Sequence, residues 1–131
     1  MRLLIVMILI LFSVSCRSDP LKGEEKGLFD KLIAFTQGEK SEKLSDDDYE
    51  QVLTFISQGK EPWVRLYPQL KKEPFSGVAF FQEGIDIAMA EALAENPAIV
   101  LGFVNKYNVG FICGMPFIEP SDNEIRDYYA K

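Results

Sequence analysis

The sequence predicts an all-α domain of five to six helices, arranged as a compact bundle or a short α-solenoid-like array. Three observations predict this fold class. Apolar residues recur at helical spacing along most of residues 27–131, capping residues precede several of these segments, and strand signals are weak throughout. The chain has 131 residues, which is one domain's worth of sequence.

Residues 1–15 have the layout of a bacterial export signal. A positive charge at Arg2 precedes an unbroken apolar run over residues 3–12, and a Ser-Val-Ser stretch leads to Cys16. The run is shorter than the roughly 20 apolar residues that a membrane-spanning helix requires. The pattern therefore predicts a cleaved signal peptide rather than a transmembrane anchor.

The stretch from Ser13 to Cys16 resembles the lipidation site of bacterial lipoproteins, whose modified cysteine becomes the first residue of the mature chain. The chain departs from the family pattern at Ser13, where the family usually has Leu, and the small residues also suit the ordinary signal peptidase. The resemblance implies palmitate-type acyl chains on Cys16, which anchor a protein stably to a membrane. Arg17 after the cysteine implies the outer membrane, with the domain facing the periplasm.

The two cysteines leave alternatives open. If Cys16 is lipidated, Cys113 is a lone thiol in an oxidising compartment, and otherwise the two could form a disulfide. The apolar run Gly-Phe-Ile-Cys-Gly at residues 110–114 favours a small buried thiol at Cys113. A catalytic or redox thiol is the third alternative.

The first two helices follow a polar tether. Residues 16–26 are polar and contain Pro and Gly, which is typical of a flexible linker between an anchor and a domain. A helix is predicted over residues 27–37. Ser45 is expected to cap the next helix, which has three Asp residues in its first turn and ends before Gly59. The acidic run lacks the Gly and the final Glu of an EF-hand loop, so capping is preferred to calcium binding.

The middle of the chain predicts one short and one long helix. Pro62 suits the first turn of the short helix, and Pro68 predicts a kink or an early end. The helix over residues 76–95 is the longest and is apolar on two sides, which places it at the centre of the domain. Gly84 would let another helix approach this one closely.

The C-terminal part begins at Asn96, which is expected to cap a helix that has Pro97 in its first turn and ends near residues 105–108. Residues 109–118 are apolar but contain Gly and Pro, so they predict either an extended segment or a short helical turn. Ser121 and Glu124 form a capping-box pattern that opens a last helix ending at Tyr129.

Composition excludes several function classes. The chain has no His, which excludes Ser-His-Asp and Cys-His catalysis and His-ligated zinc. Its net charge of −6 becomes −7 when the signal and its Arg2 are removed, which argues against nucleic-acid binding. No motif for a nucleotide, a metal or another cofactor appears, so no cofactor is expected.

The most distinctive run is Cys-Gly-Met-Pro-Phe-Ile-Glu at residues 113–119. It is either a packed crossover whose Phe117 and Ile118 enter the core, or a rigid edge that presents Phe117, Glu119 and Tyr128 to a partner. With the helical pair over residues 91–104, the run is similar to small uncharacterised exported proteins of Gram-negative bacteria. This resemblance implies no activity.

Together these features predict a non-enzymatic envelope lipoprotein that binds a periplasmic protein, preferably a basic one. Small, acidic, exported helical domains resemble the immunity proteins that neutralise cell-wall-degrading toxins. One alternative is a cell-wall hydrolase that uses Cys113 or the acids of the central helix. Those acids are Glu83, Asp86 and Glu91, which otherwise belong to a solvated helix face. Another alternative is an outer-membrane assembly or structural factor.

Overall fold

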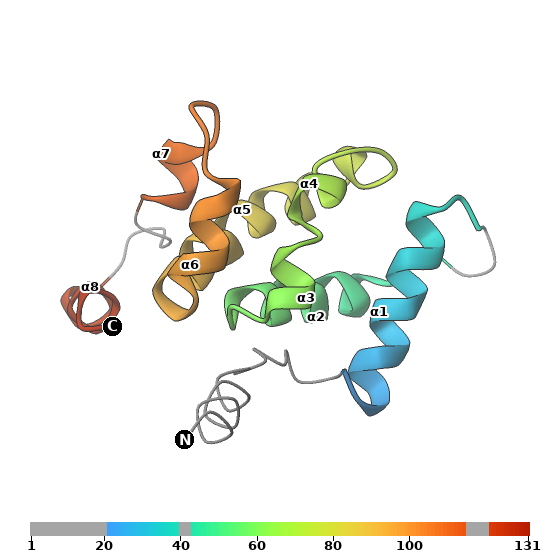
Figure 1. Cartoon of the computed structure of the whole chain (residues 1–131), viewed down its shortest axis with the longest axis horizontal. Coiled ribbons are helices and arrows are strands. Elements are labelled where there is room, and N and C mark those ends of the chain that lie inside the picture. Colours follow the sequence, from blue (N-terminus) through green and yellow to red (C-terminus); the bar gives the residue numbers. More distant parts are fainter. Residues whose placement is uncertain (1–20, 40–42, 115–120) are drawn as a thin grey trace, which may run out of the picture.

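The computed structural model describes residues 21–39, 43–114 and 121–131, and the regular structure in these residues is entirely helical. The elements are α1 (Gly23–Thr36), α2 (Asp46–Ser57), α3 (Glu61–Val64), α4 (Tyr67–Leu70), η1 (Phe75–Gly77), α5 (Ala79–Glu95), α6 (Pro97–Val100), η2 (Leu101–Phe103), α7 (Val109–Ile112) and α8 (Asp122–Tyr129) (Figure 1). The predicted all-α class is confirmed. No described helix is both long and apolar enough to cross a bilayer. The predicted signal peptide and Cys16 lie outside the described residues.

Helix α1 begins at Gly23, so the last four residues of the predicted tether are helical. Glu24 and Glu25 stand in its first turn, where they face the positive end of the helix dipole. Glu25 also accepts hydrogen bonds from α3 and its preceding residue, which gives this turn a tertiary partner. The sequence pattern alone carries no signal for such a contact.

The two predicted serine caps are confirmed. Ser45 Oγ accepts a hydrogen bond from the Asp48 backbone N–H at 3.1 Å, and the Asp48 carboxylate accepts one from the Ser45 N–H at 2.8 Å. Ser121 and Glu124 form the same reciprocal pair at the start of α8. These caps satisfy backbone donors that a helix start otherwise leaves unpaired.

Helix α5 lies at the centre and packs most extensively against α2. Gly84 is the point of close approach, because a Cβ at this position would stand 2.6 Å from Leu53 Cδ1 of α2. The predicted central helix and its close contact are therefore confirmed. It begins at Ala79 rather than Ser76, because the 3-10 turn η1 occupies Phe75–Gly77.

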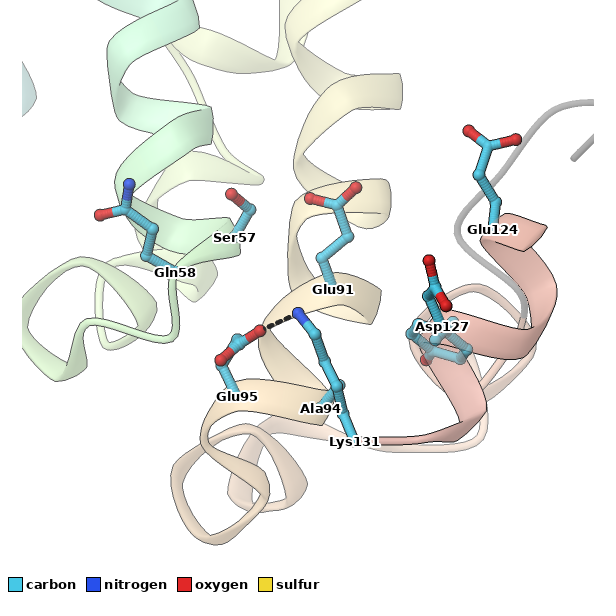
Figure 2. Close-up of a pocket in the computed structure, with 9 residues that line it drawn as sticks. Ser57, Gln58, Glu91, Ala94, Glu95, Glu124, Asp127 and Lys131 are labelled. Atoms are coloured by element: carbon cyan, nitrogen blue, oxygen red, sulfur yellow. Dashed lines mark hydrogen bonds and ion pairs between the residues drawn. The ribbon is translucent and has the colours of Figure 1, made fainter. Parts of the chain in front are cut away.

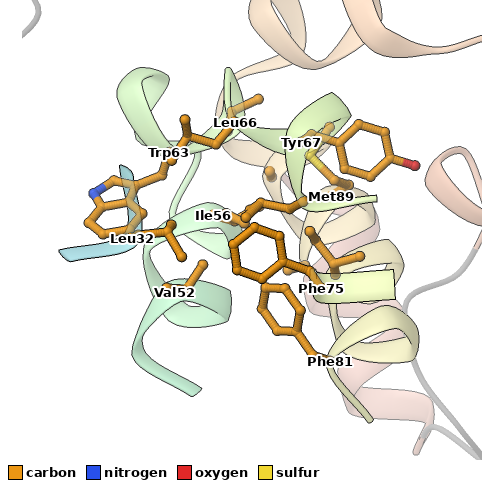
Figure 3. Close-up of a cluster of buried hydrophobic side chains, with 14 of the residues drawn as sticks. Leu32, Val52, Ile56, Trp63, Leu66, Tyr67, Phe75, Phe81 and Met89 are labelled. Atoms are coloured by element: carbon orange, nitrogen blue, oxygen red, sulfur yellow. The ribbon is translucent and has the colours of Figure 1, made fainter. Parts of the chain in front are cut away.

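The hydrophobic core is formed mainly by side chains from the segment between α1 and α5 (Figure 3), and Val100 of α6 and Ile112 of α7 complete it. Trp63 is fully buried, with the Phe29 ring edge-on at 5.1 Å and the Phe55 ring stacked at 4.9 Å. Phe75 and Phe81 are also fully buried, with ring centroids 6.1 Å apart. Burying each large apolar side chain contributes roughly 1.5–3 kcal/mol, which explains how one-turn helices such as α3 persist.

The short helices differ in part from the predictions. The helix that carries Pro62 and Pro68 is divided into α3 and α4, as the second proline predicts. Asn96 does not cap α6 through its side chain, which instead donates a hydrogen bond to the Gly59 carbonyl at 3.0 Å. The helical stretch from Pro97 ends at Phe103, before the predicted residues 105–108. Within the stretch 109–118, residues 109–112 form the short helical turn α7, and residues 115–118 lie outside the described part of the chain.

Candidate functional site

A hollow of about 550 Å³ lies where α2 ends, beside the last turns of α5 and the length of α8 (Figure 2). We call it the acidic groove. Its lining residues are Ser57, Gln58, Glu91, Ala94, Glu95, Glu124, Asp127, Tyr128 and Lys131. Glu91 and Glu95 are four residues apart on α5, and Glu124 and Asp127 are three residues apart on α8. Each spacing places the two carboxylates on one face of their helix.

The described residues that line the acidic groove carry four carboxylates and one ammonium group. The ammonium belongs to Lys131, which forms an ion pair with Glu95. The hydrogen bond and the charge of Glu95 raise the pKa of Lys131, so this lysine stays protonated. The remaining carboxylates, on Glu91, Glu124 and Asp127, leave the groove negative.

Glu91 is the most enclosed of these acids. Burial raises the pKa of its carboxyl group, and this effect exceeds the opposing hydrogen bond from Ser57 and the attraction of Lys131. A partner cation placed beside Glu91 would compensate for the lost hydration and favour the ionised form.

Of the three partner-contact residues expected from the sequence, Tyr128 lines the acidic groove. Its hydroxyl donates a hydrogen bond to the Ala90 carbonyl of α5 at 3.2 Å, and its ring lies edge-on to Tyr129. Burial raises the pKa of Tyr128. The side chain thus links α8 to α5 as well as forming part of the wall. Phe117 and Glu119 lie outside the described residues.

A second hollow of about 500 Å³ opens between α4, α5 and the segment from η2 to α7. We call it the aromatic pocket. Its lining residues are Tyr67, Pro68, Lys71, Asp86, Gly102, Phe103, Asn105, Tyr107, Asn108 and Phe111. Asp86 accepts hydrogen bonds from the Tyr67 hydroxyl at 3.2 Å and from the Lys71 ammonium at 3.1 Å. Burial, followed by the charge of Asp86, raises the pKa of Tyr67 to about 12.

The acids named as candidate catalytic residues are not brought together. Glu83 is exposed, Asp86 belongs to the aromatic pocket and Glu91 belongs to the acidic groove. Asp86 and Glu95 are nine residues apart, which puts them about 180° apart around α5. The two hollows therefore open on different sides of this helix. Sequence reasoning missed Glu95, Glu124 and Asp127, although their helical spacing with neighbouring acids was a usable signal.

Cys113 is exposed, so the expectation of a buried thiol was wrong. Helix α7 is a single turn and directs Ile112, which is fully buried, into the core. Cys113 follows Ile112 directly and faces solvent, although its sequence neighbours are apolar. Within the described part of the chain, no three His, Cys, Asp or Glu side chains are arranged to hold a metal ion.

In its described residues this is an acidic, all-α protein that carries a negatively charged groove and an aromatic pocket. No protein-family model, curated protein or solved structure matches the chain.

Proposed function

We propose that this protein is a non-enzymatic envelope lipoprotein that binds a basic periplasmic protein through the acidic groove. The observation that supports this most directly is the gathering of four carboxylates around one hollow whose only lysine is paired with Glu95. Complementary charge steers two proteins together and fixes their orientation. The net charge of −7 that remains once the signal and its Arg2 are removed adds to this attraction at longer range.

The export signal and the Cys16 lipidation pattern support the location. In this proposal, acyl chains on Cys16 hold the domain at the outer membrane, facing the periplasm. An immunity- or inhibitor-type protein is the most concrete version, since a basic cell-wall-degrading enzyme would be a suitable partner. Metabolic labelling with radioactive palmitate tests the anchor, and a soluble product without label would overturn that part of the proposal.

Capture from envelope extract tests the binding. We expect the exported chain to retain a specific basic protein, and retention to weaken as salt is added. The Asp127→Lys substitution should lower capture by about tenfold or more, because it places like charge against the partner. Glu83→Lys is the matched control, since it makes the same charge change at an exposed α5 position outside both hollows.

Two results would contradict the proposed binding. One is the recovery of no protein above background at any salt concentration. The other is an equal loss of capture in the Asp127→Lys and Glu83→Lys chains, which would mean that total charge, and not the groove, determines retention.

A hydrolase is the second candidate, and the raised pKa of Glu91 is the observation that favours it. A carboxyl group whose pKa is raised by burial and that lies beside other acids is a typical general acid. Degradation of purified peptidoglycan that Glu91→Gln abolishes would support this candidate over binding. The Cys113→Ser substitution tests the thiol version of the same hypothesis.

A further inference from the structure

Large apolar side chains are exposed mainly in one stretch of the described chain, residues 101–111, which we call the apolar edge. The exposed fractions are 56% for Leu101, 79% for Tyr107, 45% for Val109 and 63% for Phe111. Tyr107 and Phe111 also line the same hollow, the aromatic pocket, so they belong to one surface. Figure 1 shows α7 and the loop before it projecting from the helical body. Gathered apolar exposure of this kind marks an interaction surface, whereas single exposed residues do not.

The apolar edge differs in charge from the rest of the chain. Between Glu95 and Glu119 the sequence contains one charged residue, Lys106, although 26% of the whole chain is charged. The Lys106 ammonium lies 4.8 Å from the centre of the Tyr107 ring. The carboxylate in the adjacent pocket, on Asp86, is neutralised by Lys71. This is therefore a surface that does not repel phosphate groups, in contrast to the acidic groove.

The apolar edge is held outward by its own hydrogen bonds. Asn108 is buried, accepts a hydrogen bond from the Asn105 N–H at 2.7 Å and donates one to the Phe103 carbonyl at 2.9 Å. Ile112 fixes the end of α7 in the core. The hydrogen bonds of Asn108 and the burial of Ile112 thus fix the loop in an arrangement that leaves Tyr107 and Phe111 exposed.

We propose that the apolar edge is a reversible membrane contact, in which Tyr107 and Phe111 enter the interfacial layer of a phospholipid bilayer. Aromatic rings are favoured at the level of the headgroups, and Lys106 would extend from the same loop to pair with lipid phosphate. Among the described residues that line this surface, the basic protein of the proposed function meets no unpaired carboxylate. It would bind on a different side of α5, so the two surfaces have different occupants.

The test uses the full chain with the substitution Cys16→Ser, which leaves Cys113 as the single thiol. Cys113 is exposed and lies two residues beyond Phe111, so a fluorophore attached to it reports on the apolar edge. The probe membrane is a vesicle of phosphatidylethanolamine with a minor share of phosphatidylglycerol. Residues 3–12 are apolar enough to attach the chain in any case, so attachment itself is not the measurement. The measurement is quenching of the fluorophore by lipids that carry a spin label near the headgroup.

We expect quenching and a blue shift at Cys113, and loss of both when Tyr107→Ser and Phe111→Ser are combined. Tyr129→Ser removes an equally exposed ring outside the apolar edge and should leave the signal unchanged. A second chain, in which Cys113→Ser and Thr54→Cys move the thiol to an exposed position on α2, should remain unquenched. Circular dichroism verifies that each variant keeps its helices.

Three results would overturn the proposal. The first is an unquenched fluorophore at Cys113 on vesicles that have bound the chain. The second is equal quenching at Cys113 and at Thr54→Cys, which indicates non-specific adsorption. The third is a blue shift that appears only when envelope proteins are added, which would assign the apolar edge to a protein partner.

Discussion

Glu25 accepts a hydrogen bond from the buried Trp63 indole N–H at 2.8 Å and a second, also at 2.8 Å, from the Lys60 ammonium. Trp63 is fully buried, and its indole N–H is a donor that needs a partner away from water. The Glu25 carboxylate therefore attaches the first turn of α1 to α3. It also gives the Trp63 indole N–H, on the largest side chain of the core, its hydrogen-bond acceptor.

The Glu25→Ala substitution should lower the free energy of unfolding by about 1–3 kcal/mol, because it leaves the Trp63 N–H unpaired. Urea denaturation followed by Trp63 fluorescence measures this loss. Glu24→Ala changes the exposed neighbour in the same helical turn and should shift stability by no more than about 0.5 kcal/mol. Equal losses in the two variants would contradict the role of the Glu25 contact.

Stability should fall in acid, partly through Glu25 and Asp48. Burial tends to raise the pKa of each carboxyl group, but the hydrogen bonds that each one accepts outweigh this effect. Lys60 and Trp63 donate to Glu25, so its pKa is lowered. Lys31 and Ser45 donate to Asp48, so its pKa is lowered as well. A carboxyl with a lower pKa in the folded state stabilises the fold above its unfolded pKa. This contribution is lost as the pH falls through the folded pKa.

For Glu25 the loss begins near its ordinary value of 4.5 and continues below it. Urea denaturation at a series of pH values should show this decline in the native chain and a shallower decline in Glu25→Gln. Parallel curves for the two chains would argue against a contribution from this carboxylate.

Glu91 should behave in the opposite way. Burial raises the pKa of its carboxyl group, so the fold loses stability as the pH rises from the ordinary value of 4.5 through the raised folded value. Glu91→Gln removes this penalty and should make the protein more stable than the native chain at neutral pH. The difference should shrink below pH 4.5. A Glu91→Gln chain that is less stable at neutral pH would show that its charge is compensated within the fold.

Gly59 and Gly38 form a matched pair for testing close backbone approach. Both have positive φ, +68° and +81°, so an alanine at either position costs roughly 1–2 kcal/mol in backbone strain. A Cβ at Gly59 would also stand 2.9 Å from the Glu95 Cβ and 3.2 Å from the Asn96 backbone nitrogen, whereas Gly38 has open space. Gly59→Ala should therefore cost about 1–3 kcal/mol more than Gly38→Ala, by thermal or urea unfolding. Similar losses of stability in the two variants would mean that the backbone at the junction of α5 and α6 moves to accommodate the added methyl group.

Features that depend on neighbouring residues were predictable from the sequence. The caps at Ser45 and Ser121 are formed within one helical turn, and their residue types suffice to indicate them. Gly84 was also predictable, because a glycine inside a long apolar helix requires a packing reason. Leu53 supplies that reason.

Contacts between distant segments were not predictable in this way. Glu25 stands in a polar stretch that resembles a linker, and its partner Trp63 is 38 residues away. Cys113 was assigned to the core from composition, but a one-turn helix is too short for composition to show which residue faces inward. The acidic groove is likewise made by α8 folding back beside α5, which no local pattern encodes.

Because α5 contributes a wall to both hollows and also fills the centre of the core, few of its positions are free to vary. It packs against α2, α6 and α7, Gly84 is needed for the approach of Leu53, Asp86 lines one hollow, and Glu91 and Glu95 line the other. Natural variation in either recognition surface is therefore expected to accumulate on the flanking segments, α8 for the groove and residues 101–111 for the pocket. A change of partner would then leave α5 almost untouched, so that new specificities arise on an unchanged helical frame.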